Sequence, residues 1–445
     1  MFKYLAKEAN KFISTEYRKI LKNISWLFFD RIFRMGMGLV VGAWVARYLG
    51  PSEFGTFNYL LATIGIFTPF ATLGLESMVV KELVENPQRI SSIMSTTITL
   101  RLLAGLISFI ICIGILFFLK HNEIQTFYVG CILALTLFAQ ALVSIELYYQ
   151  AQVASKIAVI FQSVAYILVN VVKVILILVE AELLAFAVVT TLEMVLGGLF
   201  MIVAFKTITK QRLTVMIDKI LAKKLITRGW PLIFSGFMIM IYMRIDQIML
   251  GEMINDYEVG TYSAALKLSE IWYIIPTIIC NSFFPSIIEA KKLGEQTYLQ
   301  KIQNLFAILF AISFLIAVLV TFFSDFIITV LYGSQYRDAS TILSIHIWAS
   351  VFVFMGVASA NFFIVEHLQL KTFTRTALGA IVNIGLNLIL IPKFLAIGAA
   401  IATLISQFLS AYVFDLLSTK TYVLFRIKTR TFLGINYISH LLKKR

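Results

Sequence analysis

The feature that most restricts the fold of this chain is a series of long apolar runs, each 18 to 28 residues long with few charges. An α-helix of about 20 apolar residues crosses a hydrocarbon core about 30 Å thick, because it rises 1.5 Å per residue. Of the 445 residues, 60% are hydrophobic and only 14% are charged, whereas soluble domains carry about 25% charged residues. The chain is therefore predicted to be an all-α protein with many membrane spans.

Twelve of these runs are candidate spans, and no connection between them is long enough for a soluble domain. The predicted spans are residues 25–48, 57–80, 91–119, 126–150, 153–178, 183–205, 229–251, 259–288, 301–324, 341–365, 370–391 and 395–417. The first run lacks a small-residue cleavage site. We therefore expect it to be retained as a span and not to be removed as a signal peptide.

Basic residues are distributed unevenly over the connections. Of the 38 Lys and Arg residues, 28 lie in or beside the N-terminal segment, the even-numbered connections and the C-terminal tail, and four lie in the odd-numbered connections. Cytoplasmic segments of membrane proteins are enriched in Lys and Arg. We therefore expect both termini in the cytoplasm and an even number of spans. The net charge of +14 then reflects topology and contact with anionic membrane lipids, and nucleic acid is not a predicted partner.

A short motif occurs twice in the chain. Residues 53–57 (EFGTF) follow the first span, and residues 258–262 (EVGTY) follow the seventh, at an offset of 205. Six spans per copy is an even number, so the two copies share one orientation and form parallel repeats. The predicted organisation is an N-terminal six-helix lobe (1–206), a cytoplasmic linker (207–228), a C-terminal six-helix lobe (229–417) and a basic cytoplasmic tail (418–445). Two lobes with a site between them are typical of transporters.

Twelve charged residues, six basic and six acidic, lie where hydrocarbon is expected. Each costs at least about 2.5–3.5 kcal/mol at the middle of the membrane, so each is expected to face an internal cavity or to pair with an opposite charge. Asp30 and Arg34 are four residues apart, and Lys267 and Glu270 are three apart, so each pair lies on one helix face. Arg244 and its neighbour Asp246 point apart, and both are expected to find partners on other helices.

The predicted site is a hydrated cavity between the two halves, lined by cations that bind a phosphate-bearing or acidic substrate. The candidate cations are Arg31, Arg34, Arg101, Lys173, Arg244 and Lys267. Four carboxylates are candidates for coupling to a proton or Na⁺, namely Asp30, Glu76, Asp246 and Glu270. The candidate polar lining is Gln162 and Asn170 on span five and Asn383 and Asn387 on span eleven. For these small polar residues the alternative is hydrogen bonding between helices of a packed bundle.

Several motifs that carry chemistry do not occur in the sequence. There is no G-x-x-x-x-G-K-S/T phosphate loop, and no His, Cys and Asp cluster has metal-ligand spacing. The three cysteines lie within apolar runs, so no disulfide framework is expected. The expected extracytoplasmic connections are short and lack the carboxylate pairs of membrane glycosyltransferases. The sequence therefore predicts no cofactor, no metal and no catalytic site.

Three local motifs carry a family resemblance. The first is ARYLGPSEFG at 46–55 with LGLE at 73–76, the second is RIDQIMLG at 244–251 with VGTYSAA at 259–265, and the third is NLILIP at 387–392 with GAAIAT at 398–403. These motifs resemble those of Wzx-type polysaccharide flippases, in the polysaccharide-transporter branch of the MOP superfamily. That superfamily also holds MATE exporters and the lipid II flippase MurJ. Together with length and span number, the resemblance covers essentially the whole chain.

The resemblance implies two six-helix lobes around a central cavity. It also implies an activity, which is alternating-access movement of undecaprenyl-pyrophosphate-linked oligosaccharide from the inner to the outer leaflet of a bacterial cytoplasmic membrane. Membrane lipids, H⁺ or Na⁺ and the polysaccharide polymerase machinery are the expected partners. MurJ-like members usually have fourteen spans, and twelve spans argue against that branch.

Other functions would leave different signals in the sequence. A MATE-type drug exporter coupled to H⁺ or Na⁺ shares the fold, but the deep cations disfavour it. A membrane-embedded polymerase or glycosyltransferase would carry a long extracytoplasmic loop, which the span map lacks. A lipid-scrambling or structural role is a further alternative.

Overall fold

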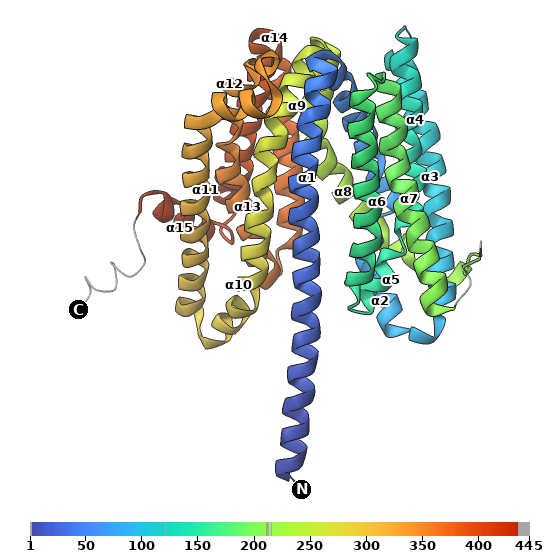
Figure 1. Cartoon of the computed structure of the whole chain (residues 1–445). Coiled ribbons are helices and arrows are strands. Elements are labelled where there is room, and N and C mark those ends of the chain that lie inside the picture. The colour runs from blue at the N-terminus through green and yellow to red at the C-terminus, as the bar shows by residue number, and fades with distance from the viewer. Residues whose placement is uncertain (1, 121, 211–212, 215, 435–445) are drawn as a thin grey trace. The chain divides into compact units, whose positions relative to one another are not determined.

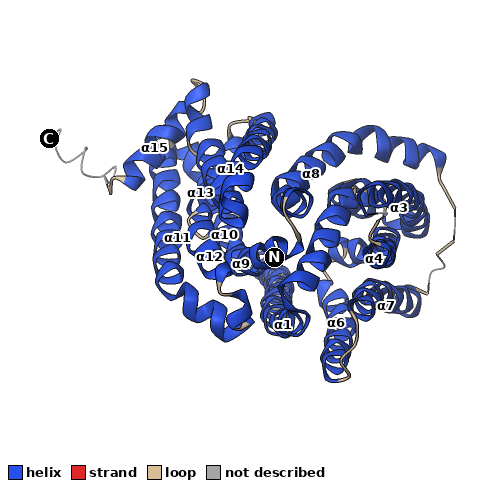
Figure 2. Cartoon of the chain, turned by 90° about the horizontal axis from the view of Figure 1, so that it is seen from above, coloured by secondary structure: helices blue, strands red, loops and turns tan. Residues whose placement is uncertain are grey.

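A computed structural model describes residues 2–120, 122–210, 213–214 and 216–434, with side chains from Ser25 onward. Within these residues every regular element is helical (Figures 1 and 2), which confirms the all-α class. The α-helices are α1 (Phe2–Thr72), α2 (Glu76–Glu85), α3 (Ile90–Lys120), α4 (Ile124–Val143), α5 (Glu146–Ala151), α6 (Ser155–Leu178), α7 (Leu183–Thr209), α8 (Lys219–Met253), α9 (Asp256–Glu270), α10 (Ile274–Leu293), α11 (Glu295–Tyr332), α12 (Asp338–His346), α13 (Ala349–Val365), α14 (Gln369–Ala411) and α15 (Tyr422–Phe432). Residues 435–445 of the predicted basic tail lie outside the described part.

Ten helical stretches of the described chain are long and apolar enough to cross a membrane. Two of them, Ser25–Glu85 and Gln369–Leu417, each contain two of the predicted spans, so the ten stretches correspond to the twelve predicted spans. The first is interrupted at Gly50, where φ is 74°, a conformation that glycine adopts at little cost. The second is interrupted at Leu395, three residues after Pro392, because proline cannot continue the helical hydrogen bonding.

The chain divides into two compact units. The first comprises Met1–Val45 and Thr63–Phe237, and the second comprises Ala46–Ala62 and Met238–Arg445. Helix α1 contributes residues to both units. In the first unit, α3 packs against α4, and α7 packs against both α4 and α6, as the view along the helices in Figure 2 shows.

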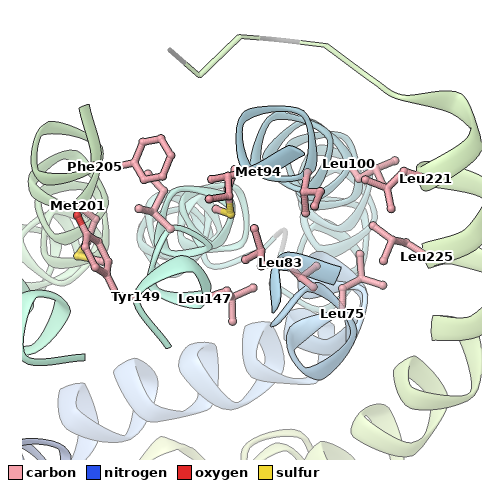
Figure 3. Close-up of a cluster of buried hydrophobic side chains, with 14 of the residues drawn as sticks. Leu75, Leu83, Met94, Leu100, Leu147, Tyr149, Met201, Phe205, Leu221 and Leu225 are labelled. Carbon is pink, nitrogen blue, oxygen red and sulfur yellow. The ribbon is translucent and has the colours of Figure 1, made fainter. Parts of the chain in front are cut away.

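The core of the first unit joins helices that are distant in sequence. Leu83 of α2, Met94 of α3, Tyr149 of α5, Phe205 of α7 and Leu225 of α8 are all buried in one cluster (Figure 3). The start of α8 belongs to this cluster, so the segment predicted as a linker packs onto the first unit at its C-terminal end.

Polar contacts fasten the same connection to the unit. Arg89 forms an ion pair of 2.5 Å with Asp218, and the backbone N–H of Asp218 donates to Thr96 Oγ1 at 3.0 Å. The carboxylate of Asp218 also accepts from the backbone N–H groups of Ile220 and Leu221, both at 3.1 Å. Asp218 therefore caps the first turn of α8, whose N–H groups have no partner within the helix.

The second unit is built around α11. Helices α10, α12, α13 and α15 pack against it, and the hairpin of α10 and α11 is seen in Figure 1. Its core includes Phe306, Phe354 and Phe362. The short helix α15 carries Lys428, which is fully buried and forms an ion pair of 2.6 Å with the equally buried Asp415. Burial lowers the pKa of the Lys428 ammonium to about 8, because the charged form loses its water.

The two copies of the repeated motif meet inside the second unit. A Cβ added at Gly55 would lie 1.7 Å from the carbonyl oxygen of Asp256, and one added at Gly260 would lie 1.9 Å from that of Pro51. The backbones of α1 and α9 therefore touch where the motif glycines face each other, which is possible only without side chains. Thr56 Oγ1 donates to the Asp256 carboxylate at 2.5 Å beside this crossing.

Candidate functional site

In the first unit, the predicted pair on α1 is formed and extended by α6. Arg34 Nε donates to Asp30 Oδ1 at 2.9 Å, and Ser163 Oγ of α6 donates to the same oxygen at 2.6 Å. Tyr166 Oη of α6 donates to the Arg34 carbonyl at 3.0 Å, and the Arg34 guanidinium lies 5.1 Å from the centre of the Tyr166 ring. Two polar side chains of α6 thus hold the charged segment of α1, while Arg31 on the same segment is exposed.

A second charged contact of this unit joins α2, α3 and the turn before α5. Arg101 is almost completely buried and donates to Glu76 Oε1 at 2.8 Å and to Ser144 Oγ at 3.1 Å. The side chain of Glu76 is about half exposed, at 52%. Arg101 is therefore held in a tight charge-assisted hydrogen bond.

The predicted polar stripe of span five is present on α6, and each of its members is engaged. Gln162 donates to Glu146 Oε2 at 3.0 Å, and Asn170 donates to the Tyr166 carbonyl at 2.8 Å. Lys173 Nζ lies 3.5 Å from Glu193 Oε2 of α7. That separation is longer than the 2.7–2.9 Å of a charge-assisted hydrogen bond, so the Lys173 ammonium retains hydrogen-bonding capacity.

In the second unit, a network forms around Asp246 of α8, which is only 5% exposed. Tyr262 Oη of α9 donates to Asp246 Oδ2 at 2.6 Å, and Thr403 of α14 donates to the same oxygen. Asn387 Nδ2 donates to Asp246 Oδ1 at 2.6 Å, and the Asn387 side-chain oxygen is buried without a hydrogen-bond partner in the described part of the chain. The carboxylate is therefore surrounded by neutral groups, and no cation is paired with it in the described contacts.

The other charged residues that were predicted for the site in this unit, Arg244, Lys267 and Glu270, lie on α8 and α9. Arg244 Nη2 is 3.5 Å from Glu270 Oε2 of α9, again longer than a charge-assisted hydrogen bond. The ammonium of Lys267 lies 4.5 Å from the centre of the Phe54 ring, within the range of a cation–π contact. Asn383 Nδ2 approaches Thr403 Oγ1 at 3.4 Å and thereby joins the Asp246 network.

Sequence reasoning identified the charged members of these groups and some polar neighbours, such as Asn387, but it missed other neutral partners. The i,i+4 contact of Asp30 and Arg34 is formed as predicted, and Arg244 and Asp246 do find their partners on other helices, as predicted. Tyr262 and Thr403 were not predicted, because a Tyr or Thr in an apolar run has no signal of its own. Arg375 was also missed, although its Nη2 donates to the Gly356 carbonyl at 3.1 Å within the second unit.

Comparison with known proteins identifies the family. A family model of polysaccharide biosynthesis proteins matches residues 20–291, which is more than half of the chain. The chain belongs to this family. A second model, of MatE proteins, matches residues 231–389. The resemblance to the polysaccharide-transporter branch of the MOP superfamily that the motifs indicated is thereby confirmed.

A curated relative agrees with this family, and solved structures share the fold of the chain. The chain is 26% identical over 413 residues to the probable low-salt glycan biosynthesis flippase Agl15 of Haloferax volcanii, covering 85% of this chain and 79% of that protein. The lipid II flippase MurJ in an inward closed conformation has a TM-score of 0.67 at 15% identity, covering 95% of this chain and 93% of the other. An inward-facing MATE multidrug transporter of the MOP superfamily also has a TM-score of 0.67, at 14% identity over 89% and 96% of the two chains. These structures show the shared fold.

Proposed function

We propose that this chain is a flippase that carries a lipid-linked oligosaccharide of the undecaprenyl-pyrophosphate class from the inner to the outer leaflet of a bacterial cytoplasmic membrane. Its termini would lie in the cytoplasm, and its two predicted lobes, 1–206 and 229–417, would alternate access to the two sides. The observation that carries the proposal is the match of the polysaccharide biosynthesis family over residues 20–291. The product would be passed to polysaccharide polymerase machinery.

The physical difficulty of this reaction is the passage of a pyrophosphate and a sugar through hydrocarbon. An ion without partners there is too costly, so protein groups must replace its water. Lys173 in the first unit and Arg244 in the second are the best candidates for this role, because each lies 3.5 Å from its carboxylate and has donors to spare. Arg101, bound at 2.8 Å, would hold the helices around the path. Arg31, Arg34 and Lys267 complete the proposed cationic lining, with Gln162, Asn170, Asn383 and Asn387 as its neutral members.

The membrane potential provides a direction for transport. With the cytoplasm negative, two negative charges moved outward gain about 2.3 kcal/mol each per 100 mV. Each positive charge that travels outward with the substrate cancels the gain of one negative charge. Movement of H⁺ or Na⁺ into the cell would add to it.

We place the coupling ion at Asp246. The carboxylate, Thr403 Oγ1 and the unpaired Asn387 side-chain oxygen offer oxygen ligands of the kind that hard cations prefer. A proton on Asp246 is the alternative, since a protonated carboxyl group needs no cation. Asp30, Glu76 and Glu270 are weaker candidates, because each has a basic partner within 4 Å. Replacement of Asp246 by Asn should remove the dependence of transport on the ion gradient, and a dependence that persists would exclude this site.

The proposed function is tested by Arg244→Ala in cells that depend on this chain for surface glycan. Loss of surface glycan with normal amounts of protein in the membrane is expected. Arg337→Ala is the matched control, because Arg337 belongs to the same unit and is 80% exposed. Unchanged surface glycan in Arg244→Ala would remove Arg244 from the path, and a wild-type protein that moves no lipid-linked sugar in vesicles would refute the function itself.

A drug exporter is the second candidate, because the MatE model matches residues 231–389. Overexpression should then raise resistance to cationic drugs, and we expect no such change. A membrane enzyme is not favoured, because Agl15, which the chain matches over 413 residues, is named as a probable flippase.

A further inference from the structure

Within the first unit, an apolar groove of about 670 Å³ runs between α1 and α6. On α1 its lining extends from Ile32 to Trp44, and on α6 from Asn170 to Ile175. The lining residues recur every three or four positions, so they form one face of each helix. Asn170 is the single polar residue among them, and its amide is already bonded to the Tyr166 carbonyl.

The surface of the groove has an opening at Gly36. A Cβ placed on this glycine would meet no atom within 4 Å, so the space beside it is not filled by protein. The neighbouring apolar side chains are also uncovered, since Val40, Trp44 and Val171 are each 44–51% exposed. On α1 the groove runs from Ile32 to Trp44, a distance of about 18 Å along the helix axis at 1.5 Å per residue.

Along both helices the groove leads directly into the polar contacts around Arg34. On α1, Asp30 precedes the groove and Arg34 lies between its lining residues Phe33 and Gly36. On α6, Ser163 and Tyr166 precede the groove. Arg34 Nη2 is buried and has no hydrogen-bond partner among the described side chains. A buried donor without a partner costs about 1–3 kcal/mol of stability, and more when it is charged. An acceptor from a ligand would remove this cost at Arg34 Nη2.

An anionic head group with a hydrocarbon chain satisfies both features together. A phosphate oxygen accepts well from a guanidinium, and this segment carries two arginines, Arg31 and Arg34, against the single carboxylate of Asp30. Lipid tails are as apolar as leucine, so filling the groove gains little hydrophobic energy over the bilayer. The contact with Arg34 would therefore supply the affinity, and the groove would fix the direction of the chain.

We propose that the α1–α6 groove holds the part of the isoprenoid chain nearest the head group of a polyprenyl-pyrophosphate-linked oligosaccharide, with the lipid-side phosphate at Arg34. The assignment rests on the proposed function, because it names the position of that same substrate's lipid part. A chain longer than the groove continues into the surrounding bilayer. The groove thus keeps the tail beside the protein while the glycan is handled elsewhere.

The test uses the full-length protein in phosphatidylcholine nanodiscs and a polyprenyl phosphate with a photoreactive diazirine on its second isoprene unit. Adducts on the wild type should map to residues 32–44 and 170–175. Labelling should fall stepwise in the series Gly36→Ala, Gly36→Leu and Gly36→Phe, because each larger side chain fills more of the open space. The yield of adduct in Gly36→Phe should be at least tenfold lower than in the wild type. Gly114→Phe on α3 is the matched control, since a Cβ there also meets nothing within 4 Å, and it should label like the wild type.

Two further comparisons complete the test. Arg34→Gln should weaken labelling by the phosphate but not by the corresponding uncharged polyprenol, which separates head from tail. Equal competition by dioleoyl phosphatidylglycerol would show a general site for membrane lipid and overturn the proposal, as would adducts outside the groove or labelling unchanged in Gly36→Phe. If Gly36→Phe does not fold, the wild-type adduct map and the mild Gly36→Ala variant still decide. Failure of the proposed function gives a different result. Vesicles that contain the wild-type protein would then move no lipid-linked sugar, whichever residues carry the photoadducts.

Discussion

Replacement of Gly260 by Ala should weaken the second unit through the crossing of α1 and α9. The added Cβ would lie 1.9 Å from the Pro51 carbonyl oxygen, whereas such contacts are essentially never below 3.0 Å, so the helices must separate by at least about 1.1 Å. The 2.5 Å hydrogen bond from Thr56 to Asp256 then lengthens to about 3.6 Å, beyond hydrogen-bonding range. Loss of a bond to a charged acceptor costs about 1.5–3 kcal/mol, and the lost packing adds to this.

The measurement is the thermal unfolding midpoint of the purified protein in detergent, followed by tryptophan fluorescence. Gly385→Ala is the control, because a Cβ at Gly385 on α14 meets nothing within 4 Å. It should leave the midpoint unchanged or raise it, since Ala favours a helix over Gly by about 1 kcal/mol. A Gly260→Ala protein as stable as the Gly385→Ala protein would contradict the close crossing.

Three other substitutions test separate contacts. Asp218→Ala should lower the unfolding midpoint, because it removes the N-cap of α8 at a cost of about 1 kcal/mol, whereas Asp218→Asn should retain most of the capping energy. Equal losses of stability in the two variants would refute the capping role. Tyr262→Phe removes a donor to Asp246 and should lower the free energy of unfolding by about 1.5–3 kcal/mol. Tyr149→Phe, at a hydroxyl that has no hydrogen-bond partner in the described chain, should not lower it. Lys428→Met leaves the buried carboxylate of Asp415 unpaired. It should lower the free energy of unfolding by about 3–5 kcal/mol. The pKa of Lys428 is lowered to about 8 from 10.5, so the folded protein binds fewer protons than the unfolded one between these values. The wild type should therefore gain stability relative to Lys428→Met as pH rises from 8 to 10.5. Unfolding midpoints that change with pH in the same way in both proteins would contradict the lowered pKa of Lys428.

Local contacts could be predicted from sequence because helix geometry alone fixes them. Asp30 and Arg34 are four residues apart and meet on one face of α1. The helix breaks were likewise foreseeable near Gly50 and Pro392, where the apolar runs ended. The partners of Asp246 could not be predicted, since Asn387 and Thr403 follow it by 141 and 157 residues. Their meeting depends on how α8 and α14 pack.

The motif glycines show the same limit. The repeat of residues 53–57 at 258–262 indicated a duplication, but it did not indicate that the two copies face each other across one helix crossing. Lys428 was counted only as a basic residue of the tail, although the structure buries it beside Asp415. A charge in a polar segment looks the same in sequence whether it is solvated or buried.

The sequence by itself determined that the chain spans a membrane many times as helices, because hydrocarbon admits only segments that satisfy their own backbone hydrogen bonds. It also determined which charges lie within those helices. Only the tertiary structure decided which of these charges are tightly bound, which keep donors to spare and where an unfilled groove adjoins them. Those properties arise from side chains on separate helices. The spacing of residues along one helix does not determine its distance from another helix.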